Sequence, residues 1–314
     1  MRKVDACAHI FPRSFWDKMQ ARAGRLPDIG EHSSGMPLFT NLDQRFRLMD
    51  RFDAYEQILS LTGPALDAIF APDVAGDMAC YANDTLAELT GRHPYRFPGF
   101  FAALSIADPD AAMAEIHRAV KELGALGVQL LANGAGPMLD RTDYAVIFRA
   151  CYDLDVPISL YPAPGADYGM TGLQSHLVFS GLMDDLPGIK IMSPQLGGLT
   201  TLVQERLSPQ TLRPLKKPYA EYFKDFYANT ALSRTRDAVV GGLSYHPRDR
   251  MMFATATADD GAVGIGNQIR AIESLDIDAE WKQDIFWRNA AKIMPFDRRE
   301  DTAPVKPSAY PLSA

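Results

Sequence analysis

The sequence has few cysteines and no long apolar runs. Its three cysteines, Cys7, Cys80 and Cys151, are scattered and form no CxxC pair. This spacing argues against a disulfide framework, so a protein of the reducing cytoplasm is expected. No apolar run approaches the roughly 20 residues that a membrane-spanning helix needs, and the first residues lack the apolar core of a signal peptide. Membrane association is therefore not expected.

An excess of positive charge is also missing. The chain has 32 Lys and Arg against 39 Asp and Glu, which gives a formal net charge of −7 and a pI near 5.4. Nucleic acid is therefore not expected as a partner, because such proteins carry a basic patch. With 47% hydrophobic and 23% charged residues, the chain has the composition of a soluble globular protein. Its 314 residues suffice for one large domain or two ordinary ones.

Strand-like and helix-like segments alternate along the chain. Strands are expected at residues 4–10, 57–61, 97–104, 127–132, 156–162, 189–193, 226–232 and 250–255. Helices are expected at residues 41–52, 76–93, 108–123, 142–154, 170–185 and 278–292, with another opening at Gly197-Gly198. The third of these begins with Asp108-Pro109, where aspartate suits the N-cap and proline the first helical position.

Eight strands alternating with helices over about 290 residues are typical of an α/β protein with a (β/α)8 TIM barrel. The alternative is an open doubly wound sheet, which is disfavoured because no early strand is followed by GxGxxG or a P-loop. We expect one barrel over residues 1–294, with a polar insertion at 13–43 over its mouth. Residues 295–314 contain four prolines and are expected to form a C-terminal tail.

In such a barrel the active site lies at the C-terminal ends of the strands. The first strand places Asp5, Cys7 and His9 at alternate positions, so the three side chains should share one face. The polar residues expected at this and the other strand ends are Cys7, His9, Ser60 or Thr62, Ser105, Gln129 or Asn133, Tyr161, Gln195, Asn229 or Thr230, and Thr255 or Thr257. This set is polar but largely uncharged, and it lacks the cluster of His, Asp and Glu that a divalent metal needs.

Several segments resemble a known family. Residues 97–116 (FPGFFAALSIADPDAAMAEI) and 121–130 (KELGALGVQL) are similar to one long passage of the amidohydrolase-related family that contains aminocarboxymuconate semialdehyde decarboxylase and the dihydroxybenzoate decarboxylases. RFRLMD at 45–50, PGIKI at 187–191, Gly197-Gly198, DRMMF at 249–253 and NAAK at 289–292 resemble later landmarks in the same order. The resemblance covers nearly the whole chain. It implies a barrel enzyme of a family that generally forms dimers or larger assemblies.

The resemblance also implies a metal site, which this chain matches poorly. The family binds a divalent ion through His-x-His on the first strand, His-Pro on the fifth, His before Gly-Gly on the sixth, and an aspartate after the eighth. The matching positions here are Cys7 and His9, Tyr161, Gln195, and Ala256. Only His9 remains, although Asp259 and Asp260 lie a few residues beyond the last position. We therefore expect no cofactor and treat a divalent zinc or manganese as the less favoured alternative.

Two functions remain compatible with these residues. The first is a metal-independent decarboxylase-like or hydrolase-like enzyme that acts on a small aromatic or unsaturated carboxylic acid by general acid/base catalysis. The expected catalytic residues are His9, Tyr161 and Gln195, and the expected pocket residues are Cys7, Asp5, Arg47, His176, Thr255 and Asp259. The second is a catalytically degenerate family member, which binds a small acid or stabilises a metal-bearing paralogue in a mixed oligomer. A homo-oligomer is expected for the first.

Overall fold

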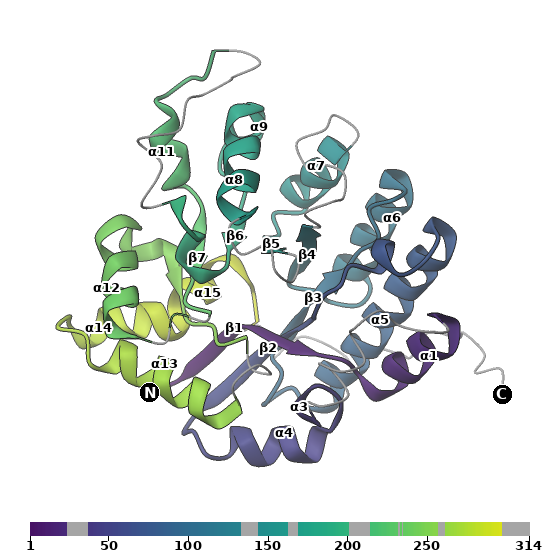
Figure 1. Cartoon of the computed structure of the whole chain (residues 1–314), viewed down its shortest axis with the longest axis horizontal. Helices are drawn as coiled ribbons and strands as arrows, with labels where there is room; N and C mark the ends of the chain where they lie inside the picture. The colour runs from purple at the N-terminus through teal and green to yellow at the C-terminus, as the bar shows by residue number, and fades with distance from the viewer. Residues whose placement is uncertain are drawn as a thin grey trace.

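A computed structural model describes residues 1–23, 37–132, 144–162, 169–200, 214–231, 233, 235–256 and 261–296. Within these ranges eight parallel strands form one sheet in the order β1 to β8 (Figure 1). The strands are β1 Lys3–Ile10, β2 Tyr55–Leu61, β3 Gly99–Ala103, β4 Gly127–Ala132, β5 Ile158–Pro162, β6 Ile191–Ser193, β7 Tyr227–Asn229 and β8 Met251–Met252. Beyond β8, two backbone hydrogen bonds return to β1, Ala6 N to Phe253 O (2.9 Å) and Ala256 N to Cys7 O (3.0 Å). They bring the two ends of the sheet together, so the predicted barrel is confirmed.

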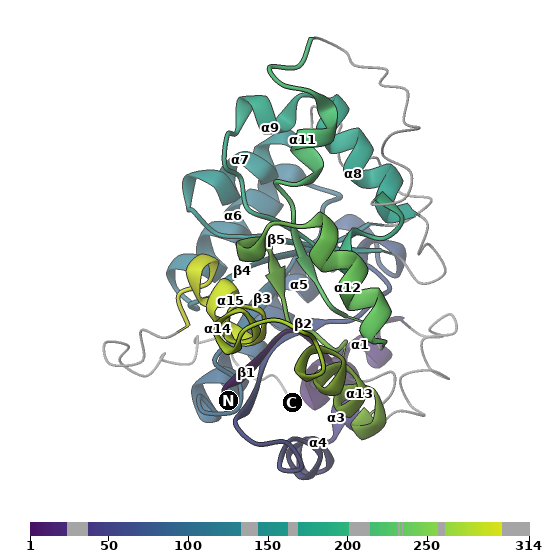
Figure 2. The same ribbon diagram turned by 90° about the vertical axis from the view of Figure 1, so that its left-hand side faces the viewer.

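The described helices lie outside the strands in both views (Figures 1 and 2). They are α1 Arg13–Ala23, α3 Pro37–Thr40, α4 Leu42–Met49, α5 Pro72–Arg92, α6 Pro109–Lys121, α7 Ala145–Asp153, α8 Gly169–Phe179, α9 Leu182–Asp185, α11 Tyr219–Phe223, α12 Arg236–Tyr245, α13 Gly261–Glu273, α14 Ala279–Gln283 and α15 Asn289–Ile293. A π-helical segment, Asp284–Arg288, joins the last two. No helix of the described residues is long and apolar enough to cross a membrane.

Local sequence signals explain most helix ends. Asp108 accepts hydrogen bonds from the backbone N–H groups of Asp110 and Ala111, with Pro109 as the first residue of α6, so the predicted cap is confirmed. The single helix expected up to Asp185 is wrong, because the chain breaks between α8 and α9. Gly181 lies there with φ +80°, a left-handed conformation that glycine adopts without strain.

The segment after β1 contributes to the core. Phe15, Trp16 and Met19 on α1 are buried, and so is Phe39 on α3. These apolar side chains lie among polar residues, which is why composition alone indicated a surface insertion at 13–43. Residues 24–36 and 297–314 lie outside the described part of the chain. The division into a barrel and a C-terminal tail therefore stays a prediction.

The interior of the barrel is filled at the N-terminal end of the strands. Val4, Ala6, Ile58, Phe101 and Met192 form one buried apolar cluster there. Met294 and Phe296, which follow α15, belong to the same cluster and close this end. The C-terminal ends of the strands are consequently the end at which a ligand can enter.

A buried amide ties α5 to the C-terminal end of β3. Asn83 Nδ2 donates to Ala103 O (3.0 Å) and to Glu115 Oε1 (2.6 Å), while Ala103 N donates to Asn83 Oδ1 (2.7 Å). Replacing Asn83 by alanine removes the side-chain partner of the Ala103 backbone and one hydrogen bond of Glu115, whose Oε1 still accepts from Arg118 (2.9 Å). We expect Asn83→Ala to lower the free energy of unfolding by roughly 2–4 kcal/mol in urea titrations.

The control for this variant is Asn267→Ala, which removes an amide from a partly exposed position on α13. A surface change of this kind should cost less than about 0.5 kcal/mol. Equal effects of the two substitutions would contradict the anchoring role of Asn83.

Candidate functional site

Three side chains gather around His9 at the C-terminal end of β1. His9 Nδ1 lies 3.0 Å from Ser60 Oγ on β2, and His9 Nε2 lies 3.7 Å from Cys7 Sγ. The ring of Tyr161, at the end of β5, meets the His9 ring edge to face, with 4.5 Å between ring centroids. His9 is 2% exposed and Tyr161 is half-buried. The structure therefore brings together Cys7, His9 and Tyr161, and of the two residues expected at the end of β2 it places Ser60 beside them.

Burial controls the charge of this histidine. Desolvation, and to a smaller extent the positive charge of Arg45, lower the pKa of His9 to about 4, while a backbone hydrogen bond with Leu61 opposes both effects. At neutral pH the free protein therefore holds a neutral imidazole, with one ring nitrogen that donates and one that accepts. Next to the Ser60 hydroxyl and the Tyr161 ring, such an imidazole can pass or accept a proton without carrying a lasting charge.

Asp5 does not share the face of His9, which corrects the sequence prediction. The pairing of β1 with β2 shifts between Asp5 and Ala8, so Asp5 lies opposite Gln57 whereas His9 lies opposite Ser60. Ser60 and Ile58 face the barrel interior, and residues 55, 57 and 59 face the helices. The extra residue of a β-bulge reverses the alternation of side chains along the strand. A period of two along the sequence cannot show such an insertion.

Behind β1 this arrangement creates a second polar group, which we call the outer cluster: Asp5, Arg45, Tyr55, Gln57 and Thr255. The Asp5 carboxylate accepts hydrogen bonds from Tyr55 Oη (2.7 Å), Thr255 N (3.0 Å), Cys7 N (3.1 Å) and Thr255 Oγ1. Burial raises the pKa of Asp5, and these hydrogen bonds oppose the rise. Arg45 donates to Gln57 Oε1 (2.7 Å) and to the backbone oxygen of His9 (2.8 Å). The outer cluster thus holds the strand that carries His9.

Gln195 follows β6 in a turn of unusual backbone conformation. Four consecutive residues have positive φ: Gln195 (+53°), Leu196 (+55°), Gly197 (+82°) and Gly198 (+65°). The two non-glycine residues are strained in this region and need support from their surroundings. A right-handed helix was expected to open at Gly197-Gly198, and this left-handed turn replaces its start. Residues 201–213 lie outside the described residues.

His246 supplies part of that support. Its side chain is buried, and Nε2 lies 3.0 Å from the Leu196 carbonyl oxygen, so Nε2 carries the hydrogen. Gly242 allows α12 to approach, because a Cβ atom there would lie 2.9 Å from Leu196 Cδ2. Burial lowers the pKa of His246, and the bond to Leu196 opposes this. Sequence reasoning missed His246 because it lies fifty residues beyond the turn that it contacts.

Three predicted pocket residues do not join the group around His9. Arg47 is exposed on α4, whereas Arg45 and Leu48 form the buried face of that helix. His176 is exposed on α8. Thr255 is buried but belongs to the outer cluster. Asp259 lies outside the described residues, so its place in the pocket stays a prediction.

The lowered pKa of His9 gives stability a definite pH dependence. The folded state disfavours the charged imidazole, so the unfolded chain binds the proton first as the pH falls below 6.5. The stability that the neutral imidazole supplies is fully present above about pH 6.5 and is lost as the pH falls to about 4. Between pH 7 and pH 4, the free energy of unfolding of the wild type relative to His9→Asn should fall by about 3 kcal/mol. Urea unfolding of the wild type and of His9→Asn at both pH values measures this change. If the difference in free energy of unfolding between the two proteins stays constant with pH, His9 is not desolvated in the folded state.

The support of the left-handed turn can be tested at His246. His246→Leu leaves the Leu196 carbonyl without its donor, so we expect a loss of about 1–3 kcal/mol in the free energy of unfolding. His246→Gln keeps a donor and should recover much of the loss. His117→Leu, at an exposed position of α6, is the control for removing a histidine. If His246→Leu resembles the control, the turn is held by other contacts.

Comparison with known proteins gives relatives that match nearly the whole chain. A gamma-resorcylate decarboxylase of Polaromonas sp. (strain JS666) is 30% identical over 312 residues, which cover 88% of this chain and 94% of the relative. A second gamma-resorcylate decarboxylase, from Rhodococcus jostii (strain RHA1), is 27% identical over 328 residues, covering 93% of this chain and 94% of the relative. A solved structure of dihydroxybenzoic acid decarboxylase from Polaromonas sp. JS666 superimposes with a TM-score of 0.77 at 27% identity, over 95% of this chain and 98% of that one.

The solved relative overturns one sequence prediction. Its structure contains bound manganese together with the inhibitor 2-nitroresorcinol, so the expectation of no cofactor was wrong. The donors in the described part of this chain nevertheless do not fit that ion. No group of three or more His, Cys, Asp and Glu side chains converges among these residues. Cys7 and His9 offer sulfur and nitrogen, whereas manganese prefers carboxylate and carbonyl oxygen.

The family assignment rests on the full length of the barrel. The family model described as amidohydrolase matches residues 4–296, a range that begins within β1 and extends past β8 and α15. The motifs noted in the sequence lie within the same range, and the Polaromonas relative reaches 30% identity across it. The chain therefore belongs to the amidohydrolase family.

Proposed function

We propose that this protein is a decarboxylase of small hydroxylated aromatic carboxylic acids. The observation that carries the proposal is the buried group of His9, Ser60 and Tyr161 at the open end of the barrel. Both gamma-resorcylate decarboxylase relatives match this chain over nearly its whole length, which supports the same reaction class here.

The reaction breaks the bond between the carboxyl carbon and the ring. The electron pair of this bond stays on the ring carbon, which takes a proton, and the carboxylate leaves as CO2. The protein must therefore hold the ring in place and deliver one proton to a carbon atom. An ortho hydroxyl on the substrate assists, because its oxygen donates electron density into the ring as the proton adds to the carbon that bears the carboxylate.

His9 and Tyr161 are the groups suited to the proton transfer. The imidazole is neutral in the free protein, and its edge-to-face contact with Tyr161 places a phenolic hydroxyl on the same side of the barrel. Ser60 fixes the ring through His9 Nδ1, which leaves Nε2 directed toward Cys7. In the proposed reaction the neutral His9 takes the proton of the substrate's ortho hydroxyl and returns it to the ring carbon, so that CO2 and a phenolate leave. Tyr161 donates a hydrogen bond to the substrate, and Gln195 orients the acid from the β6 turn.

The test is release of CO2 from 2,6-dihydroxybenzoate and related acids by the purified protein. The assay includes samples with added manganese and with a chelator, because a solved relative binds that ion. We expect Tyr161→Phe and His9→Gln to lower kcat by about 10²–10⁴-fold, the usual contribution of a positioned acid or base.

Tyr152→Phe is the matched control, because Tyr152 lies on α7 and stacks with Arg149 away from the barrel interior. It should leave kcat unchanged. Failure of the wild type to release CO2 from any acid of the panel, with or without manganese, would overturn the proposal. Binding of the same acids without turnover would instead favour a small-acid binder or partner subunit.

A further inference from the structure

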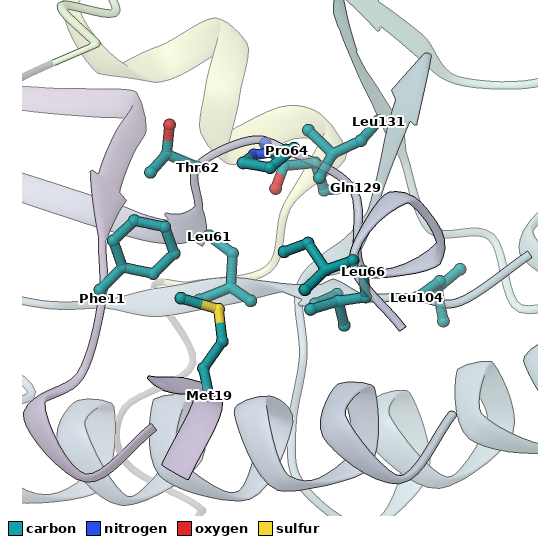
Figure 3. A pocket seen from close by; sticks show the side chains of 11 residues that line it. Phe11, Met19, Leu61, Thr62, Pro64, Leu66, Leu104, Gln129 and Leu131 are labelled. Atoms are coloured by element: carbon teal, nitrogen blue, oxygen red, sulfur yellow. The ribbon is translucent and has the colours of Figure 1, made fainter. Parts of the chain in front are cut away.

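A small cavity adjoins the His9 group on the side of β2, β3 and β4. Its volume is about 10 Å³, and its walls include Phe11, Leu61, Leu66, Leu104 and Leu131. Figure 3 shows these apolar side chains together with the amide of Gln129, which lies beside Pro64. Phe11 follows the end of β1 that carries His9, and Leu61 follows Ser60. Leu131, in the wall of the cavity, is paired with Tyr161 in the sheet, so the cavity borders the proposed active site.

Gln129 is the unusual member of this wall. Its side chain is 3% exposed, and neither Oε1 nor Nε2 has a hydrogen-bond partner among the described residues. A buried amide without partners costs free energy, so native proteins rarely keep one without a reason. Leucine or methionine would fill the same space at lower cost. The amide is thus expected to meet its partner in a bound state.

The position of Gln129 agrees with a role toward substrate. In the sheet it lies opposite Ala103 on β3 and Ser159 on β5. Two residues further along β4, Leu131 lies opposite Tyr161. Residues two apart on a strand point to the same face, so Gln129 faces the barrel interior one layer below the level of Tyr161. A ring held against His9 and Tyr161 can therefore direct a substituent downward onto this amide.

We propose that Gln129 binds a ring hydroxyl of the substrate and so selects hydroxylated acids; this inference rests on the proposed function. A hydroxyl both donates and accepts, so it can bond to Oε1 and to Nε2 whichever way the amide is turned. A volume of 10 Å³ corresponds to about one water-sized group. It admits a hydroxyl and is too small for a methoxy or carboxyl group. A methyl group approaches the right size but leaves the amide unpaired.

Binding of inert ligands tests this assignment independently of turnover. The pair is 2-nitroresorcinol, which carries two ring hydroxyls, and 3-methyl-2-nitrophenol, in which one of them is a methyl group. Neither has a carboxyl group to lose, so calorimetry reads recognition even if the protein releases no CO2. We expect the wild type to bind 2-nitroresorcinol about 10- to 100-fold more tightly than the methyl compound.

Gln129→Leu should abolish that preference, because it weakens the binding of 2-nitroresorcinol and leaves the binding of 3-methyl-2-nitrophenol unchanged. Its unfolding midpoint without ligand should equal or exceed that of the wild type, because an unpaired buried amide has been removed. Gln268→Leu is the matched control, since Gln268 on α13 is also buried with an unpaired Oε1. The control should keep the wild-type preference between the ligands.

The assignment is overturned if the wild type binds both ligands equally or binds neither of them. It is also overturned if Gln129→Leu weakens the binding of both ligands equally. A lower unfolding midpoint of Gln129→Leu without ligand would overturn it as well. The last result would show that Gln129 serves the fold. If discrimination is found but no acid is decarboxylated, the recognition role stands and the proposed reaction fails. If acids are decarboxylated but Gln129 does not discriminate between the two ligands, the proposed reaction stands and the recognition role of Gln129 fails.

Discussion

The hydrogen bonds that converge on Asp5 fix the part of the barrel on which the site depends. Four donors from Cys7, Tyr55 and Thr255 hold one buried carboxylate between β1 and the segment after β8. They stabilise the shift of register in β1, and this shift turns His9 toward the interior and Asp5 toward the helices. The same carboxylate joins the first and last strands where the barrel closes. One interaction therefore sets both the closure of the barrel and the direction of its key histidine.

Arg45 extends this constraint to the surface of the barrel. Its side chain is fully buried, and it links α4 to Gln57 and to the backbone of His9. Burial of the guanidinium lowers the pKa of Arg45 to about 10, and the nearby Tyr55 and Asp5 raise it. Its charge also lowers the pKa of His9. A residue outside the interior thus influences both the position and the protonation of a residue within it.

Much of the fold could be predicted because its signals are local. The alternation of strands and helices and the cap at Asp108 depend on neighbouring residues or on simple periods. The prediction failed where a single inserted residue or a contact between distant segments determines the direction of a side chain. The bulge in β1 moved Asp5 and Thr255 away from His9, and the phase of α4 buried Arg45 where Arg47 was expected. Matching ligands position by position led to the expectation of no cofactor, which a solved relative with bound manganese contradicts, although no group of three potential ligands converges among the described residues.

The apolar cluster at the N-terminal end of the strands closes that end of the barrel, so a ligand enters at the C-terminal end of the strands. Met294 and Phe296 fill the N-terminal end of the barrel, so the part of the chain that the structure describes leaves no second exit beneath His9. For the proposed reaction, the acid must enter and both products must leave by the same route. CO2 is small and can depart past the ring, whereas the phenol blocks the way until it leaves. The closed N-terminal end of the barrel therefore determines the order of product release, with CO2 leaving before the phenol. The phenol should compete with the next molecule of acid for the same site.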